Sequence, residues 1–177
     1  MTEQISFFVP GEPTPQGSMK PITLPGQSWT QLIADNDAEL KRWRAKVGEL
    51  AKLAANLQDW SPRRQDAMHL TCRFLLPMPA SRPASIRKQE IALCGVKPDL
   101  DKLIRAIGDA FTEYEVLFDD SRIVKGGQVK YEVLDHGLCG AEVVLRVIDL
   151  VAERDAMIEV LERRRAHRSL PMSRPRS

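Results

Sequence analysis

The sequence predicts an α/β domain followed by a basic helical extension, and three observations support this. The chain has 177 residues, of which 43% are hydrophobic and 28% charged, so it can bury one core but is short for two domains. Strand-like apolar segments alternate with two stretches of helical periodicity. No apolar run approaches the roughly 18 residues of a membrane span. We therefore expect one folded domain over residues 1–148 and an extension over residues 149–177.

The first half of the chain predicts a strand, a long connection, a helix and a second strand. Residues 5–9 are apolar and end at Pro10, and the Pro- and Gly-rich residues 10–28 indicate a loop or an irregular hairpin. Residues 36–57 carry apolar side chains at spacings of three and four, which is typical of an amphipathic helix. Residues 68–76 form the next expected strand, which Pro77 ends.

The second half predicts a further strand–helix–strand arrangement. After a second long connection over residues 78–97, residues 99–113 form a helix whose apolar face begins at Leu100 and ends at Phe111. A long strand is expected over residues 122–133, with a bulge at Gly126 and Gly127. A last strand over residues 141–148 closes the domain, and residues 149–168 form the appended helix.

Composition excludes several functional classes. The three cysteines are far apart and lack a C-x-x-C pair, and no two of the three histidines have metal-ligand spacing, so zinc sites and disulfides are disfavoured. No P-loop, G-x-G-x-x-G or G-x-S-x-G motif occurs, so no nucleotide cofactor is expected. The N-terminus does not resemble a signal peptide, which favours a cytoplasmic location.

The charge distribution is uneven. Six arginines and no acidic residue lie in residues 163–177, which leaves 20 basic against 24 acidic residues in the rest of the chain. Such a tail is suited to binding a polyanion. A solvated tail without a specific partner explains the same residues.

Four aspartates in two short segments are the strongest functional signal. Lys97-Pro98-Asp99-Leu100-Asp101 opens the helix expected at residues 99–113, and Asp119-Asp120 precedes the following strand. Each pair alone has a structural explanation, as helix cap and first-turn acid or as a turn. Together they indicate a site for a hard divalent cation such as Mg²⁺, with Mn²⁺ as a substitute.

The joint pattern favours phosphodiester chemistry. If the chain returns alongside the helix, Asp120 can approach Asp99 and Asp101. A divalent ion held there would activate water and stabilise charge on the attacking and leaving oxygens. Arg105, one turn after Asp101, would neutralise the substrate phosphate, or it would simply pair with Asp101 on an exposed helix face.

These residues resemble the RusA family of Holliday junction resolvases, especially its phage-borne members. K-P-D-L-D-K-L…D-A-F…F-D-D-S-R-I-V…K follows the family pattern D-L-D-N-L, a basic residue two positions later, D-A-L, then D-D-x-x-I/V before a basic strand. The resemblance covers most of residues 5–148. It implies a small mixed sheet with two main helices packed on it, and a homodimer that resolves four-way DNA junctions by Mg²⁺-dependent paired, symmetric nicks in recombination and repair.

The resemblance also implies roles for individual residues. The essential carboxylates fall on Asp99, Asp101 and Asp120, with Asp119 in support, and the assisting lysine falls on Arg105. Lys102 stands where the family usually has Asn. Arg105 keeps the charge of the usual lysine, but a guanidinium cannot replace a lysine that must transfer a proton.

The segment Asp99-Leu100-Asp101, together with Asp119-Asp120, is called the acidic motif below. Basic residues around it are candidates to bind DNA phosphates without reading sequence. They are Lys20, Arg82, Arg87, Lys88, Lys97, Lys102, Lys125 and Lys130.

Two other functions compete with the resolvase reading. A branched-DNA binding protein without catalysis would account for the changed residues at positions 102 and 105. A metal-dependent transferase would use the D-x-D motif with a nucleotide diphosphate, although no nucleotide-binding βαβ unit is evident.

Overall fold

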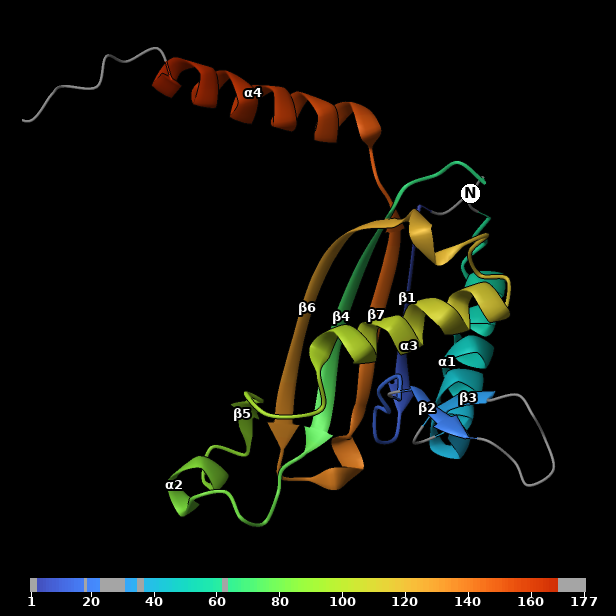
Figure 1. Cartoon of the computed structure of the whole chain (residues 1–177), viewed down its shortest axis with the longest axis vertical. Coiled ribbons are helices and arrows are strands. Elements are labelled where there is room, and N and C mark those ends of the chain that lie inside the picture. The colour runs from blue at the N-terminus through green and yellow to red at the C-terminus, as the bar shows by residue number, and fades with distance from the viewer. Residues whose placement is uncertain (1–2, 18, 23–30, 35–36, 62–63, 169–177) are drawn as a thin grey trace, which may run out of the picture. The chain divides into compact units, whose positions relative to one another are not determined.

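Figure 1 shows the chain as a computed structural model, which describes residues 3–17, 19–22, 31–34, 37–61 and 64–168. The chain divides into two compact units, Met1–Val147 and Ile148–Ser177. The strands of the first unit are β1 (Gln4–Pro10), β2 (Met19–Ile22), β3 (Gln31–Ala34), β4 (Met68–Pro77), β5 (Ile91–Leu93), β6 (Ile123–Val133) and β7 (Gly140–Val147). Its helices are α1 (Asp37–Leu57), α2 (Ala84–Arg87) and α3 (Leu100–Glu113), with 3-10 turns η1 (Asp120–Arg122) and η2 (His136–Leu138).

Five strands form one mixed sheet in the order β1-β7-β4-β6-β5, and β2 and β3 form a separate antiparallel pair. Within the large sheet β4 and β6 run parallel, whereas the other neighbours are antiparallel. A parallel pair needs a long crossover, and the crossover between β4 and β6 contains α3. The small mixed α/β fold expected from the sequence is therefore confirmed.

One face of the sheet carries the hydrophobic core. The side chains of Leu70, Cys72 and Phe74 on β4 point to this face and are fully buried. Helices α1 and α3 pack on this face (Figure 1). The rings of Phe7 on β1 and Phe111 on α3 meet edge-on with centroids 6.2 Å apart. Apolar residues spaced three and four positions apart give α1 and α3 the apolar stripe that covers the sheet.

The two helices also lie close to each other. A Cβ added at Gly48 of α1 would come within 2.1 Å of the Tyr114 ring, which follows α3. The absence of a side chain at position 48 therefore allows the C-terminal end of α3 to approach α1.

The register of the parallel pair decides which β6 side chains face the helices. Gln128, Lys130 and Glu132 are the partners of Cys72, Phe74 and Leu76, so they share the helix-covered face. Lys125 pairs with His69 and lies on the opposite face of the sheet.

Two details differ from the sequence-based expectation. The bulge expected at Gly126 and Gly127 is absent, because both residues pair in register with Leu70 and Thr71. The irregularity lies earlier, between the pairs Met68–Ile123 and His69–Lys125. The connection over residues 78–97 also contains α2 and β5, which are four and three residues long and too short for a periodic signal.

The second unit contains α4 (Leu150–Arg168), as expected from its pattern. Asp149 caps this helix, since its Oδ1 accepts the Val151 and Ala152 N–H groups at 2.9 and 3.1 Å. None of the helices in the described parts of the chain is long and apolar enough to cross a membrane.

Candidate active site

The first turn of α3 presents two carboxylates. Asp99 occupies the N-cap position, yet its side chain makes no capping hydrogen bond. Its carboxylate is 51% exposed and lies 3.6 Å from the Lys102 ammonium, between Oδ2 and Nζ. Asp101, in the first helical turn, is also exposed. Helix capping therefore does not account for Asp99, and its oxygens face solvent at the start of the helix.

The loop after β1 lies against the same turn. The Gln16 N–H donates to the Lys102 carbonyl at 2.9 Å. This contact brings Gln16 to the start of α3. Lys20, expected to meet DNA, has its side chain outside the described residues.

Asp120 is held against the middle of α3 by a short turn. A Cβ placed on Gly108 would lie 3.4 Å from Asp120 Cβ and 4.0 Å from its Oδ2. Asp119 fixes this turn, because its Oδ1 accepts the Ser121 N–H at 2.9 Å. Hydrogen bonds from the Ser121 side chain and amide lower the pKa of Asp119. Asp119 thus supports Asp120 by capping η1.

Asp101 and Asp120 lie along one face of α3, but the three carboxylates expected to be essential do not converge on one point. Asp101, Arg105 and Gly108 recur at spacings of four and three, which places them on one face of α3. Gly108 lies about 10 Å along the axis from Asp101, at 1.5 Å per residue. Asp120 beside Gly108 is therefore separated from Asp101 by two helical turns, with Arg105 between them. No ion pair joins Asp101 to Arg105, both of which the structure describes.

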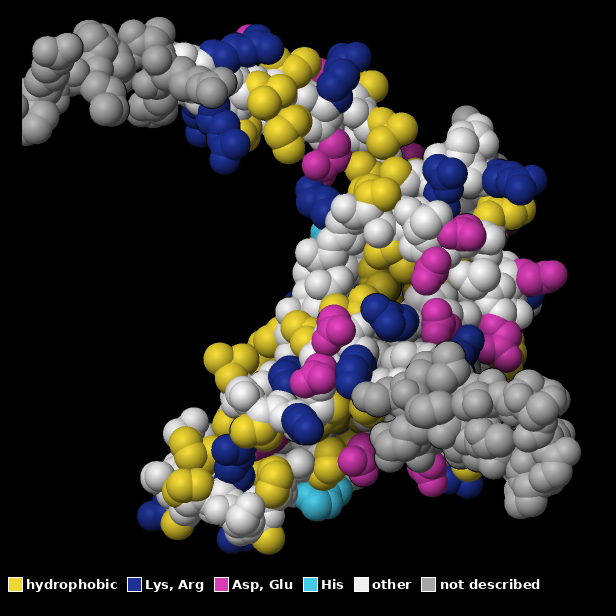
Figure 2. Space-filling model, in the orientation of Figure 1, with side chains coloured by type: hydrophobic (Ala, Val, Ile, Leu, Met, Phe, Trp, Pro, Cys, Tyr) yellow, Lys and Arg dark blue, Asp and Glu magenta, His cyan; other side chains and the backbone are white. Residues whose placement is uncertain are grey.

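A cavity of about 520 Å³ extends from Asp120 towards α1. Its other lining residues are Lys41, Arg44, Asp109, Thr112 and Glu113. The Arg44 guanidinium bridges α1 to α3, with Nη1 3.6 Å from Asp109 Oδ2 and Nη2 3.1 Å from Glu113 Oε2. Figure 2 shows acidic and basic side chains interleaved over this part of the surface. Lys41 and Arg44 were not predicted to line a site, because in the sequence they look like ordinary polar residues on the outer face of an amphipathic helix.

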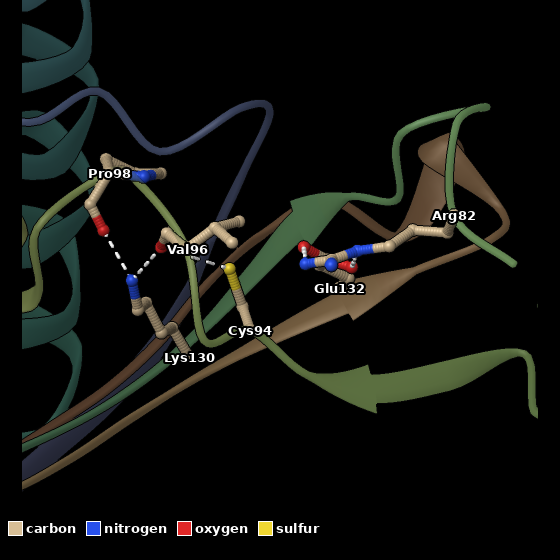
Figure 3. Close-up of polar contacts among 6 residues, drawn as sticks. All are labelled: Arg82, Cys94, Val96, Pro98, Lys130 and Glu132. Atoms are coloured by element: carbon tan, nitrogen blue, oxygen red, sulfur yellow. Dashed lines mark hydrogen bonds and ion pairs between the residues drawn. The ribbon is translucent and has the colours of Figure 1, made fainter. Parts of the chain in front are cut away.

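Two side chains expected to contact DNA, Arg82 and Lys130, instead form hydrogen bonds within the protein (Figure 3). Arg82 forms a bidentate pair with Glu132, with Nε to Oε2 at 2.7 Å and Nη2 to Oε1 at 2.5 Å. The Lys130 ammonium donates to the carbonyls of Val96 and Pro98. Both basic groups therefore have partners within the protein, which makes them less available to DNA phosphates than an exposed lysine.

The remaining basic candidates are dispersed. Lys97 is exposed immediately before the acidic motif, and Arg87 and Lys88 are exposed at the end of α2. Lys102 is half-buried beside Asp99. Lys125 is exposed on the sheet face opposite α3, so it lies away from the acidic motif.

Comparison with protein families gives one match. The family described as Endodeoxyribonuclease RusA matches residues 10–138, which include α3, η1 and all four aspartates. The chain belongs to the RusA family. It has no significant match to an individual curated protein.

Membership of the RusA family identifies the chain as an endodeoxyribonuclease, a hydrolase that acts on DNA. The family comprises Holliday junction resolvases that bind branched DNA and are in general dependent on a divalent metal. Membership supports the endonuclease and not the transferase alternative that the D-x-D motif had left open.

The RusA candidates fit a divalent metal by their chemistry. Asp99, Asp101 and Asp120 offer only carboxylate oxygens, the ligands that hard divalent ions prefer. Within the described residues, no three acidic, histidine or cysteine side chains lie close enough together to hold a metal ion. The chemical type of these ligands therefore suits a divalent ion. Asp99 and Asp101 lie at the start of α3, and Asp120 lies further along the helix.

Proposed function

We propose that this RusA-family chain is a Mg²⁺-dependent, structure-selective endonuclease that resolves four-way junctions by paired symmetric nicks. The observation that carries the proposal is that Asp99 occupies the N-cap position of α3, yet its side chain makes no capping hydrogen bond. An exposed carboxylate that does not cap the helix, next to the exposed Asp101, is suited to holding a cation. Asp120, anchored on the same helix face, supplies the third carboxylate of the set.

Each residue of this face has a distinct role in nicking. Water adds to the scissile phosphorus, and one deoxyribose oxygen leaves. A divalent ion bound there would supply the Lewis acidity that activates the water and stabilises the charge on both oxygens. Asp99 and Asp101 would hold it at the start of α3 and Asp120 would offer its carboxylate further along the helix, while Arg105, between Asp101 and Asp120, would neutralise the non-bridging phosphate oxygens. Arg105 acts through its charge and its hydrogen-bond donors alone.

We also propose that the active form is a homodimer in the cytoplasm. A four-way junction has near two-fold symmetry, so paired nicks need two equivalent sites related by a two-fold axis. Sedimentation of the protein alone and with one junction equivalent tests this stoichiometry. A single protomer bound to each junction would refute it.

The deciding experiment is cleavage of a labelled synthetic four-way junction by the wild type and by Asp101→Asn. Each protein is tested in several sequence contexts with Mg²⁺, Mn²⁺ or EDTA. We expect symmetric nicks that need the metal and are lost in the variant, while junction binding and the melting temperature stay unchanged. Tight binding by a folded wild type without cleavage in any context would instead support a non-catalytic junction-binding role.

One departure from the family favours a slow enzyme. Lys102 stands where the family usually has a neutral Asn, and its ammonium pairs with the Asp99 carboxylate. This pair competes with a cation for the same carboxylate. We expect Lys102→Asn to lower the Mg²⁺ concentration needed for half-maximal cleavage, and an unchanged requirement would show that the pair does not compete.

A further inference from the structure

The segment that leads into the acidic motif is tied to one residue of β6. The Lys130 Nζ donates to the Val96 carbonyl and, at 2.6 Å, to the Pro98 carbonyl (Figure 3). The Lys130 carbonyl accepts the Cys94 N–H at 3.0 Å. The Cys94 thiol donates to the Val96 carbonyl at 3.5 Å. Residues 94–98 are thus held by both the backbone and the side chain of Lys130.

The position of Lys130 in the sheet explains these contacts. It pairs with the fully buried Phe74 and lies on the helix-covered face, where it is only partly exposed. An ammonium group that leaves water needs acceptors, and two backbone carbonyls supply them. Glu132 on the same face forms its hydrogen bonds with Arg82, and the Lys130 ammonium donates to the carbonyls of the loop.

We propose that Lys130 is a positioning residue for the acidic site. The inference rests on the proposed function. Pro98 is followed directly by Asp99, and Asp101 lies in the next turn of α3, so the carbonyls held by Lys130 fix the point from which both carboxylates project. Loss of the ammonium would free residues 95–98 and let both aspartates sample other orientations. Partners that orient metal-binding residues are typically worth 10–100-fold in metal affinity or activity.

This role differs measurably from the phosphate contact expected from the sequence. A phosphate contact contributes to junction affinity and to its salt dependence, and its loss lowers the salt slope by about one. A positioning residue acts after binding, on metal affinity and on the rate of cleavage of bound DNA. The two roles therefore predict opposite outcomes for the same variant.

The test compares Lys130→Met with Lys130→Arg and with Lys125→Met. Met keeps the length and apolar stem of lysine, and Arg keeps donors for both carbonyls. Lys125→Met removes a lysine from the same strand but from the opposite face. Four quantities are measured for each protein: the single-turnover cleavage rate at saturating enzyme, junction Kd against salt, Mn²⁺ binding without DNA by electron paramagnetic resonance, and hydrogen exchange over residues 94–101.

We expect Lys130→Met to reduce the cleavage rate and the Mn²⁺ affinity about 10–100-fold and to speed exchange at residues 94–99. Junction Kd should stay within about two-fold with an unchanged salt slope. Lys130→Arg should recover most of both losses, and Lys125→Met should leave the Mn²⁺ affinity and the exchange over residues 94–99 as in wild type.

A weaker Kd with a lower salt slope and a normal rate at saturation would overturn the proposal in favour of a phosphate contact. Unchanged exchange over residues 94–99 would overturn it as well. If Lys130→Met does not fold, Lys130→Gln replaces it under the same criteria. If the wild type cuts no junction, the proposed function fails, while exchange and Mn²⁺ binding still decide the role of Lys130.

Discussion

The Arg82–Glu132 pair gives the sharpest prediction for stability. Glu132 is only 2% exposed and the Arg82 side chain 27% exposed. The hydrogen bonds from Arg82 lower the pKa of Glu132, against the opposing effect of burial. Glu132→Gln keeps the shape of the side chain but removes its charge, so the Arg82 guanidinium loses its ionic partner.

The magnitude follows from burial. Breaking a fully buried pair costs about 3–5 kcal/mol, and the partial exposure of Arg82 reduces this to about 2–4 kcal/mol. For a protein of this size that loss corresponds to a fall in melting temperature of about 5–15 °C. Glu142→Gln is the matched control, because its Oε2 lies 2.6 Å from Arg73 Nη1 but the two side chains are 48% and 56% exposed. An exposed pair contributes less than about 1 kcal/mol.

The assay is urea unfolding of the wild type and both variants at pH 7 and at pH values below 4. Because the folded-state pKa of Glu132 lies below its ordinary 4.5, the contribution of the pair is complete above pH 4.5. It is lost as the pH falls through the folded-state pKa, so the difference between wild type and Glu132→Gln should shrink in acid. Equal losses for the two glutamine variants at pH 7, or a difference that grows in acid, would refute the reasoning.

Three further predictions concern the site and the tail. Arg105→Lys should retain cleavage and Arg105→Ala lower it about 10–100-fold, measured under single turnover; equal losses would show that its charge is not used. Gly108→Ala should be tolerated, because its Cβ meets Asp120 at an ordinary 3.4 Å. The bulkier Gly108→Val should displace Asp120 and reduce cleavage in a protein that still folds; equal cleavage by the two would contradict this. Removing residues 149–177 should weaken junction binding and lower its salt slope without changing the rate of the bound complex, whereas unchanged binding would indicate a tail without a DNA role.

The elements that carry the site follow from local patterns, and for that reason the sequence predicts them well. The helix expected at residues 99–113 is α3, because its apolar spacing and the preceding Pro98 act within a few residues. The strand expected at residues 122–133 is β6, apart from a first turn of 3-10 helix.

How far the chain returns after α3 was not predictable, because it depends on packing between distant segments. The Val116 and Leu117 N–H groups both donate to the Phe111 carbonyl, at 2.8 and 3.2 Å, and both side chains are buried. This tight reversal brings Asp120 back to the level of Gly108 and no further. The expected approach of Asp120 to Asp99 and Asp101 is therefore only partial in the structure.

The basic residues of β6 show where the limit of sequence reasoning lies. Lys125 and Lys130 are five positions apart, an odd spacing that must place them on opposite faces of a regular strand. The sequence alone therefore argued against grouping them as one DNA-binding surface. The sequence did not show which of the two lysines lies on the helix-covered face, because lysine is polar and gives no sign of burial. The pairing of β6 with β4 decides that point, because it places Lys130 beside Phe74 and under the loop that presents Asp99.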